Sequence, residues 1–94
     1  MERTAKEMHT QYLYELIASI QDPKDVQALL DDLCTRKDVE NMAERIYAAQ
    51  LLIDGNTYNQ VMSQASISSA TLSRVSRCVQ YGNGYSKLLP KTEK

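Results

Sequence analysis

The chain has 94 residues, of which 43% are hydrophobic and 24% are charged, and its formal net charge is −1. This length fits one small domain with a limited core, and this composition excludes an intrinsically disordered chain. No apolar run approaches the roughly 20 residues of a membrane-spanning helix, and residues 1–11 lack the apolar core of a signal peptide, so we expect a cytoplasmic protein with no membrane partner.

The charges are divided unevenly along the chain. Residues 1–56 hold six Lys and Arg against eleven Asp and Glu, whereas residues 57–94 hold five against one. The net charges of the two parts are therefore −5 and +4. A basic C-terminal part suits a module that presents this part to a polyanion, although small domains often have a lopsided charge by chance.

Cysteine and histidine are too few and too far apart for a metal or redox site. Cys34 and Cys78 form no C-x-x-C pattern, and His9 is the one histidine. We therefore expect partly buried free thiols in a reducing compartment and no metal. His9 has no partner acid or nucleophile, and no convergent set of titratable residues is visible, so we expect no enzyme.

The sequence shows helical patterns throughout, and its few Gly and Pro residues stand at the breaks. The first helix is expected over residues 5–20, where apolar residues recur with a period of about 3.6. Asp22 is a good N-cap and Pro23 suits the first helical position, which predicts a second helix ending near Leu33.

A third, long helix is expected from its N-cap at Thr35 to Ile53, with Gly55 ending it. Its apolar residues form one stripe and also extend to both sides, which is more apolar surface than one core-facing stripe requires. A short chain with this much apolar surface predicts an obligate homodimer in which residues 1–53 pack against a partner chain. The alternative is a compact monomer.

Two further helical patterns follow, joined by a short run of small residues. Thr57 and Gln60 form a capping box before a helix over residues 58–64. Ser68 is the expected N-cap of a helix over residues 69–81. Two helices of about seven and thirteen residues with a short turn are typical of a helix-turn-helix, a pattern that also occurs by chance in all-α proteins.

The second of these helices has one apolar stripe and an opposite face of small polar and basic residues. Leu72, Val75 and Val79 form the stripe. The opposite side carries Ala70, Ser73, Arg74 and Arg77. Hydroxyl and methyl groups at the N-terminal end can meet base edges in the major groove, and the arginines can reach phosphates or guanine edges.

These elements give one domain over residues 1–94. Residues 1–53 are the dimerisation helices, residues 57–81 are the helix-turn-helix, and residues 82–94 are a C-terminal turn and tail that begins at a helix-ending Gly82.

Three motifs carry a resemblance to a known family. "DDLCT", "AERIYAAQLLIDGNTY" and "SSATLSRVSRCVQYGNGY" lie within residues 28–86. With them the chain resembles the tryptophan-repressor superfamily, and more closely the tryptophan-repressor-related YerC/YecD family of small bacterial proteins. The resemblance implies an all-α, TrpR-like helical bundle that forms an intertwined homodimer with one helix-turn-helix per chain. It also implies sequence-specific binding of double-stranded DNA and transcriptional repression.

The resemblance extends the set of residues expected to contact DNA. Thr57, Tyr58 and Asn59 match family positions on the first helix of the pair, and several small residues match positions at the start of the second. Caps and core packing are alternative roles for Thr57, Ser68 and Tyr58. The full set is Thr57, Tyr58, Asn59, Ser68, Ser69, Ala70, Thr71, Ser73, Arg74 and Arg77.

A small-molecule corepressor is the further feature that the family brings. Thr35, Arg45 and Arg74 match the positions that bind the carboxylate and ring of tryptophan in the repressor. However, Val75 and Cys78 stand where the repressor has glycine and serine. Tryptophan is therefore not the expected ligand, no cofactor is expected, and whether another small molecule binds stays open.

An alternative function is protein interaction without DNA. A dimeric protein-interaction module could use the same helix-turn-helix scaffold without DNA, since fold does not fix function, and the acidic first part of the chain is consistent with it.

Overall fold

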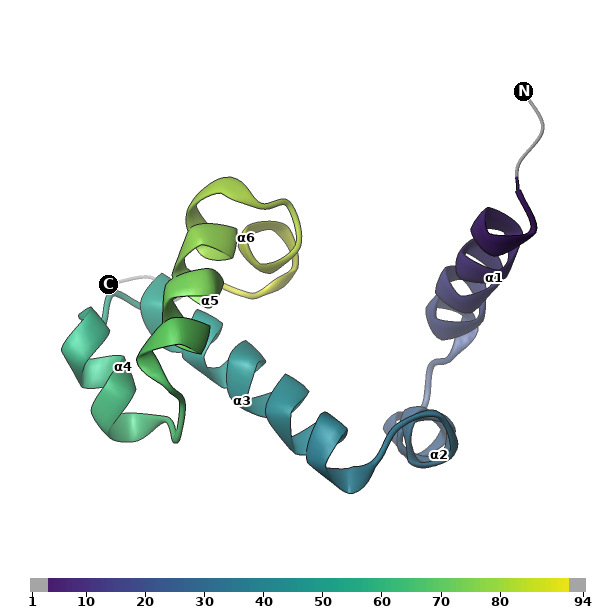
Figure 1. Cartoon of the computed structure of the whole chain (residues 1–94), viewed down its shortest axis with the longest axis horizontal. Coiled ribbons are helices and arrows are strands. Elements are labelled where there is room, and N and C mark those ends of the chain that lie inside the picture. The colour runs from purple at the N-terminus through teal and green to yellow at the C-terminus, as the bar shows by residue number, and fades with distance from the viewer. Residues whose placement is uncertain (1–3, 92–94) are drawn as a thin grey trace. The chain divides into compact units, whose positions relative to one another are not determined.

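Figure 1 shows the computed structural model of the chain, in which residues 4–91 are described. Every regular element in this range is a helix, which confirms the predicted all-α class. The helices are α1 (Ala5–Ser19), α2 (Pro23–Leu33), α3 (Arg36–Ile53), α4 (Tyr58–Gln64), α5 (Ser69–Tyr81) and α6 (Tyr85–Leu88). The five main helices were predicted, and α6 supplies the extra turn expected in the tail.

The chain divides into two units, Met1–Arg36 and Lys37–Lys94. The first unit contains α1 and α2, and the second contains the other helices except for the first residue of α3. The expectation of a single domain over residues 1–94 stays a prediction.

In the first unit, polar side chains cap the helices. The Thr4 hydroxyl accepts a hydrogen bond of 3.1 Å from the Glu7 amide at the start of α1. Asp22 accepts one of 2.9 Å from the Lys24 amide at the start of α2, which confirms its predicted cap. Neither helix buries a side chain within this chain.

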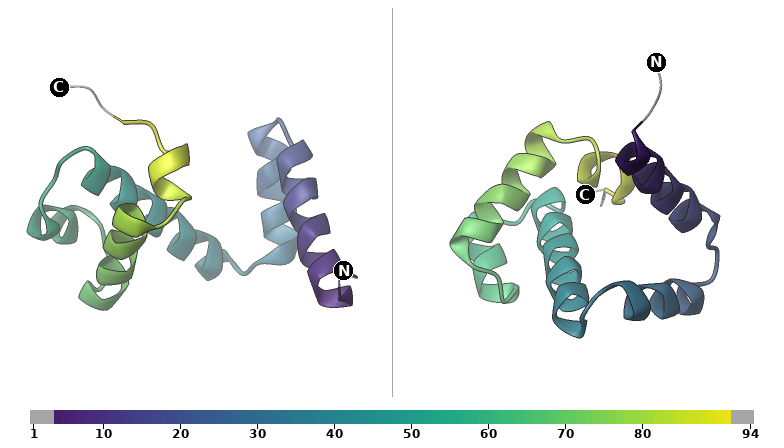
Figure 2. Two further views of the ribbon diagram at one scale, coloured as in Figure 1. Left: turned by 90° about the horizontal axis from the view of Figure 1, so that it is seen from above. Right: turned by 45° about the vertical axis from the view of Figure 1, so that its right-hand side comes forward.

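The core lies in the second unit, at the C-terminal half of α3. Ala48 and Ala49 are fully buried there, together with Val61 of α4 and Leu72 of α5. Both views of Figure 2 show α4 and α5 against this part of α3. Because two small alanines face them, α4 and α5 can approach the α3 backbone closely. This packing fixes the positions of α4 and α5 relative to α3.

The end of α3 is a Schellman motif. The amide of Gly55 donates to the Leu52 carbonyl (3.1 Å), and the amide of Asn56 donates to the Leu51 carbonyl (3.0 Å). Gly55 has a φ of 100°, in the left-handed region that glycine adopts without strain. The predicted stop at Gly55 is confirmed, and the chain turns directly into α4.

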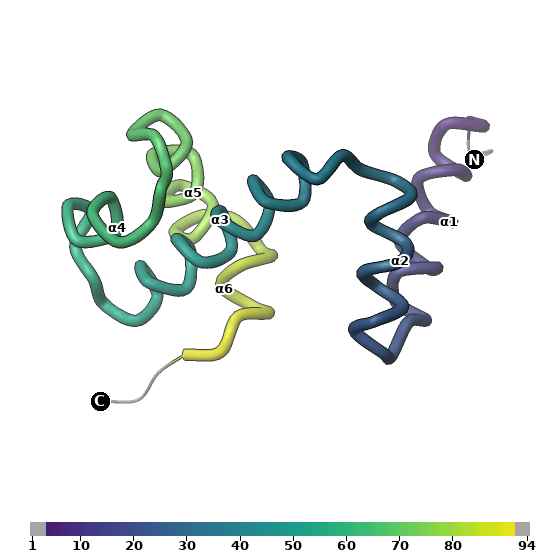
Figure 3. The backbone as a smooth tube through the Cα atoms, turned by 90° about the horizontal axis from the view of Figure 1, so that it is seen from below, coloured from purple at the N-terminus to yellow at the C-terminus, as the bar shows by residue number. Residues whose placement is uncertain are grey.

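The chain after α5 returns to the core. Tyr85 and Leu89 pack against the buried cluster, and the Gln50 side chain donates a 2.8 Å hydrogen bond to the Pro90 carbonyl. Figure 3 shows α6 passing alongside α3. The C-terminal segment therefore packs against the buried cluster and is bonded to α3 through Gln50.

Candidate nucleic-acid interface

The turn between α4 and α5 is anchored by two apolar side chains. Ala65, the C-cap of α4, is 5% exposed, and Ile67 is partly buried against the core. The amide of Ile67 donates to the Ala65 carbonyl at 2.8 Å, which tightens the turn. Ser66 and Ser68 between and after them are exposed. The apolar side chains of the turn thus hold it against the core, while its polar side chains face solvent.

The N-terminus of α5 is capped by Ser68, as predicted. The Ser68 hydroxyl accepts a hydrogen bond from the Thr71 amide (3.2 Å) and donates one to the Thr71 hydroxyl (3.0 Å). Ser69 and Ala70, between them, are exposed, and the Ser69 hydroxyl has no hydrogen-bond partner among the described residues. The first turn of α5 therefore presents a free hydroxyl and a methyl group on a rigid backbone.

α4 is joined to the start of α5 by a side chain. The Tyr58 hydroxyl donates a 2.8 Å hydrogen bond to the Ser69 carbonyl. At the start of α4, the Thr57 hydroxyl accepts from the Gln60 amide (3.2 Å), and Gln60 Oε1 accepts from the Thr57 amide (2.7 Å), which is the predicted capping box. Thr57 and Tyr58 thus have structural roles here, and Asn59 is exposed beside them.

The two faces of α5 are those expected from its pattern. Leu72 and Val75 are 0% and 2% exposed, whereas Arg74 and Arg77 point to solvent. Ala70 and Ser73 are also exposed. α5 therefore offers a continuous polar and basic face that is not used for packing within its own unit.

Arg45 and Arg74, two of the three predicted effector residues, line one cavity of about 220 Å³. Val75, Cys78 and Tyr85 also line it. The third predicted residue, Thr35, lies in the first unit, directly before α3, and its association with the two arginines stays a prediction. Cys34 and Cys78 are free and partly buried, as expected.

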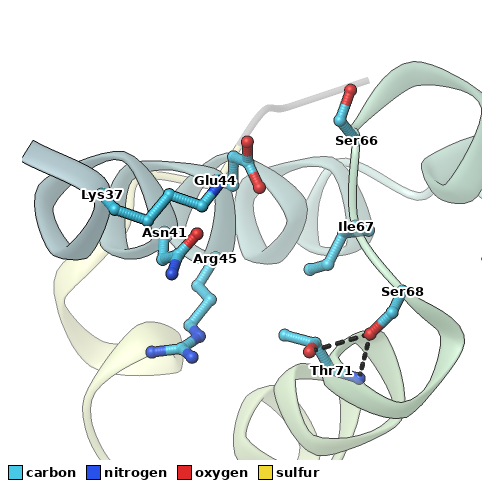
Figure 4. A pocket seen from close by; sticks show the side chains of 8 residues that line it. All are labelled: Lys37, Asn41, Glu44, Arg45, Ser66, Ile67, Ser68 and Thr71. Atoms are coloured by element: carbon cyan, nitrogen blue, oxygen red, sulfur yellow. Dashed lines mark hydrogen bonds between the residues drawn. The ribbon is translucent and has the colours of Figure 1, made fainter.

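A second cavity, of about 340 Å³, lies between α3 and the turn (Figure 4). On one side are Lys37, Asn41 and Arg45 of α3, and on the other are the small residues of the turn and the start of α5. Our sequence reasoning missed Lys37 and Asn41. Their spacing of four residues from one another and from Arg45 was a signal, because it places all three on one helix face.

The sequence of the chain matches a known protein family. Residues 8–93 match the sequence profile of the family described as Trp repressor protein. The chain belongs to the Trp repressor family. It is 39% identical over 71 residues to the uncharacterized protein YerC of Bacillus subtilis strain 168, which covers 76% of this chain and 68% of that protein. The resemblance inferred from the three motifs is therefore confirmed.

Solved structures of Trp repressor relatives share the fold. A crystal structure from Staphylococcus aureus, provisionally described as a Trp repressor, matches with a TM-score of 0.81 and 26% identity, over 94% of this chain and 92% of that chain. The crystal structure of a TrpR-like protein from Eubacterium eligens ATCC 27750 matches with a TM-score of 0.80 and 30% identity, over 85% and 84%. These similarities confirm the predicted TrpR-like fold.

Between residues 4 and 91, none of the helices has the length and apolar character that crossing a bilayer requires. The same stretch holds no group of three or more His, Cys, Asp or Glu side chains placed to bind a metal ion.

Proposed function

We propose that the protein is a sequence-specific DNA-binding regulator of transcription that acts as a homodimer through α4 and α5, most simply as a repressor. The observation that carries the proposal is the exposed face of α5. This face begins with the free hydroxyl of Ser69 on a capped, rigid helix end and continues to Arg74 and Arg77. Membership of the Trp repressor family supports the same role.

The residues of this face are suited to two different kinds of DNA contact. A hydroxyl and a methyl group on the first turn of α5 can read hydrogen-bonding groups and thymine methyls in the major groove. The arginines farther along suit the phosphate backbone, which fixes orientation and carries no sequence information of its own. In the proposed complex, Ser69 and Ala70 therefore specify the sequence, and Arg74 and Arg77 supply affinity.

The homodimer part of the proposal is supported by the first unit. Met8, Tyr12 and Tyr14 of α1 are 58%, 67% and 59% exposed, and Leu33 of α2 is 55% exposed. Burying a large apolar side chain contributes about 1.5–3 kcal/mol, so leaving these in water forgoes much of the stability available to a small chain. A second copy of the chain is the proposed cover, because the resemblance to the Trp repressor implies an intertwined homodimer.

A corepressor is not part of the proposed mechanism. Arg45 and Arg74, the two arginines that match the corepressor site, line one cavity together with Val75. Val75, 2% exposed, fills space beside the two arginines. We therefore propose that DNA binding requires no tryptophan.

In-vitro selection of duplexes on the purified protein, with and without added amino acids, tests this function. The expected result is an enriched site with two related half-sites about one helical turn apart, since a dimer presents two reading helices. The enriched site should be the same with and without amino acids. If no duplex is enriched in either arm, and a protein partner survives nuclease treatment in pulldown, the scaffold serves protein interaction and the proposal fails.

A further inference from the structure

Three residues of α3 line the cavity that faces the start of α5. Lys37, Asn41 and Arg45 are spaced at four-residue intervals, which places them on one face of the helix. In Figure 4, Arg45 points toward the start of α5, and Lys37 extends along α3. Lys37 and Arg45 are exposed, and Asn41 is partly buried. Among the described residues, no hydrogen bond or ion pair engages these three side chains. Their donor groups are therefore available to an outside acceptor.

This row continues into the basic face of α5. Arg45 and Thr71 line this cavity of about 340 Å³ and also the neighbouring one of about 220 Å³, which contains Arg74. Arg74 and Cys78 in turn line a third cavity, of about 400 Å³, which contains Arg77. Each of these cavities thus shares lining residues with the next. We call the surface that lines the three cavities the basic furrow and define it by its cations, which are Lys37, Arg45, Arg74 and Arg77.

The charge of the basic furrow selects the kind of partner. Glu44 is the one acidic side chain that lines it among the described residues, against four cations. One small anion would neutralise one or two of these charges and leave the others facing each other. A DNA strand carries a phosphate about every 3.4 Å, so it can supply a partner to each cation along the furrow.

We propose that Lys37, Asn41 and Arg45 bind the phosphate backbone of one DNA strand beside the groove that α5 enters. This inference rests on the proposed DNA-binding function and extends the DNA-contacting surface from α4 and α5 to the N-terminal half of α3. Lys37 and Arg45 pair with phosphate oxygens of the DNA, and the Asn41 side-chain amide donates a hydrogen bond to the sugar-phosphate backbone of the same strand. The negative charge of Glu44 repels the phosphates of the strand and so weakens binding.

The test is a salt titration of the full-length protein on a duplex obtained by in-vitro selection, followed by fluorescence anisotropy from about 50 to 200 mM salt. Lys37→Gln should weaken binding and make the slope of log affinity against log salt shallower by about 0.9. Lys37→Arg, which keeps the positive charge, should have the same slope as wild type. Glu44→Gln should tighten binding a few-fold, which loss of structure would not do.

A matched control separates a local contact from net charge. Lys87 on α6 is exposed and lines none of the three cavities of the furrow. Lys87→Gln removes the same charge, and we expect it to leave the slope as in wild type. A neutral methylphosphonate scanned along the duplex should then reveal one position that weakens wild-type binding and leaves Lys37→Gln unaffected.

Two results would overturn the inference while leaving the proposed function intact. One is a wild-type slope for Lys37→Gln together with a wild-type methylphosphonate profile. Another is binding of inorganic phosphate that Lys37→Gln abolishes with no change in DNA binding, which would make the cavity a small-anion site. By contrast, a wild-type protein with no salt-dependent affinity for any duplex would refute the DNA-binding function itself.

Discussion

Gly82 follows the last turn of α5, and the space around it leaves no room for a side chain. α5 ends at Gly82, as predicted, and the φ of −85° of this residue lies in a region open to every residue. A Cβ at this position would lie 2.7 Å from the Cys78 carbonyl oxygen, to which the Gly82 amide also donates. The predicted helix end is confirmed, and glycine is favoured there because a Cβ would clash with the Cys78 carbonyl.

Gly82→Ala should therefore destabilise the fold. Forcing a methyl group against a backbone carbonyl costs about 1–3 kcal/mol, which in a chain of this size lowers Tm by roughly 4–8 °C per kcal/mol. Gly84→Ala is the matched control, because a Cβ at Gly84 meets nothing within 4 Å. Thermal unfolding followed by circular dichroism measures both, and equal Tm values for the two variants would contradict this account.

Tyr58 provides the second prediction at this scale. Tyr58→Phe removes the hydroxyl that donates to the Ser69 carbonyl, so we expect a loss of about 0.5–1.5 kcal/mol in the free energy of unfolding. Tyr81→Phe is the control, since Tyr81 is 82% exposed and its hydroxyl has no partner among residues 4–91. Urea denaturation measures both. A Tyr58→Phe midpoint as high as that of the control would mean that the bond does not hold α4 to α5.

At the scale of the element, local rules predicted the helices well. Periodic apolar residues and caps such as Asp22 and Ser68 act within one turn, so their effect can be read from neighbouring letters. The cavity lined by Lys37 could not be predicted in this way, because it exists only where α3 and the turn before α5 meet in space. Tyr58 was expected to contact DNA, and its bond to Ser69 likewise depends on tertiary packing.

The two ends of α5 should respond differently to mutation. Ser69→Ala removes a free hydroxyl at the proposed base-reading end, so it should change the preferred sequence and leave the salt slope as in wild type. Arg77→Ala removes a proposed phosphate contact, so it should weaken binding to all duplexes alike. Repeating the duplex selection on each variant distinguishes these effects. A shifted preference for Arg77→Ala with none for Ser69→Ala would reverse the proposed roles.

At the scale of the whole molecule, the apolar surface of α1 predicts a dimer. Ile17 is 45% exposed in the single chain, and a carboxylate placed there would be buried without a partner in the proposed dimer interface. Ile17→Asp should therefore shift the protein to monomers in analytical ultracentrifugation, and it should weaken binding to a duplex with two half-sites. Lys6→Gln, an exposed polar change on the same helix, should leave the dimer intact. A monomeric wild-type protein at all concentrations would contradict the proposed homodimer.

The central claim is that the exposed basic face of α5 binds DNA. It is tested most directly by comparing the salt dependence of wild type with that of the double variant Arg74→Gln/Arg77→Gln on the same selected duplex. Each phosphate contact contributes about 0.9 to the slope, so we predict a slope that is shallower by about 1.8 and a weaker affinity throughout. A wild-type protein without salt-dependent affinity for any duplex, or a double variant with the wild-type slope, would contradict the claim.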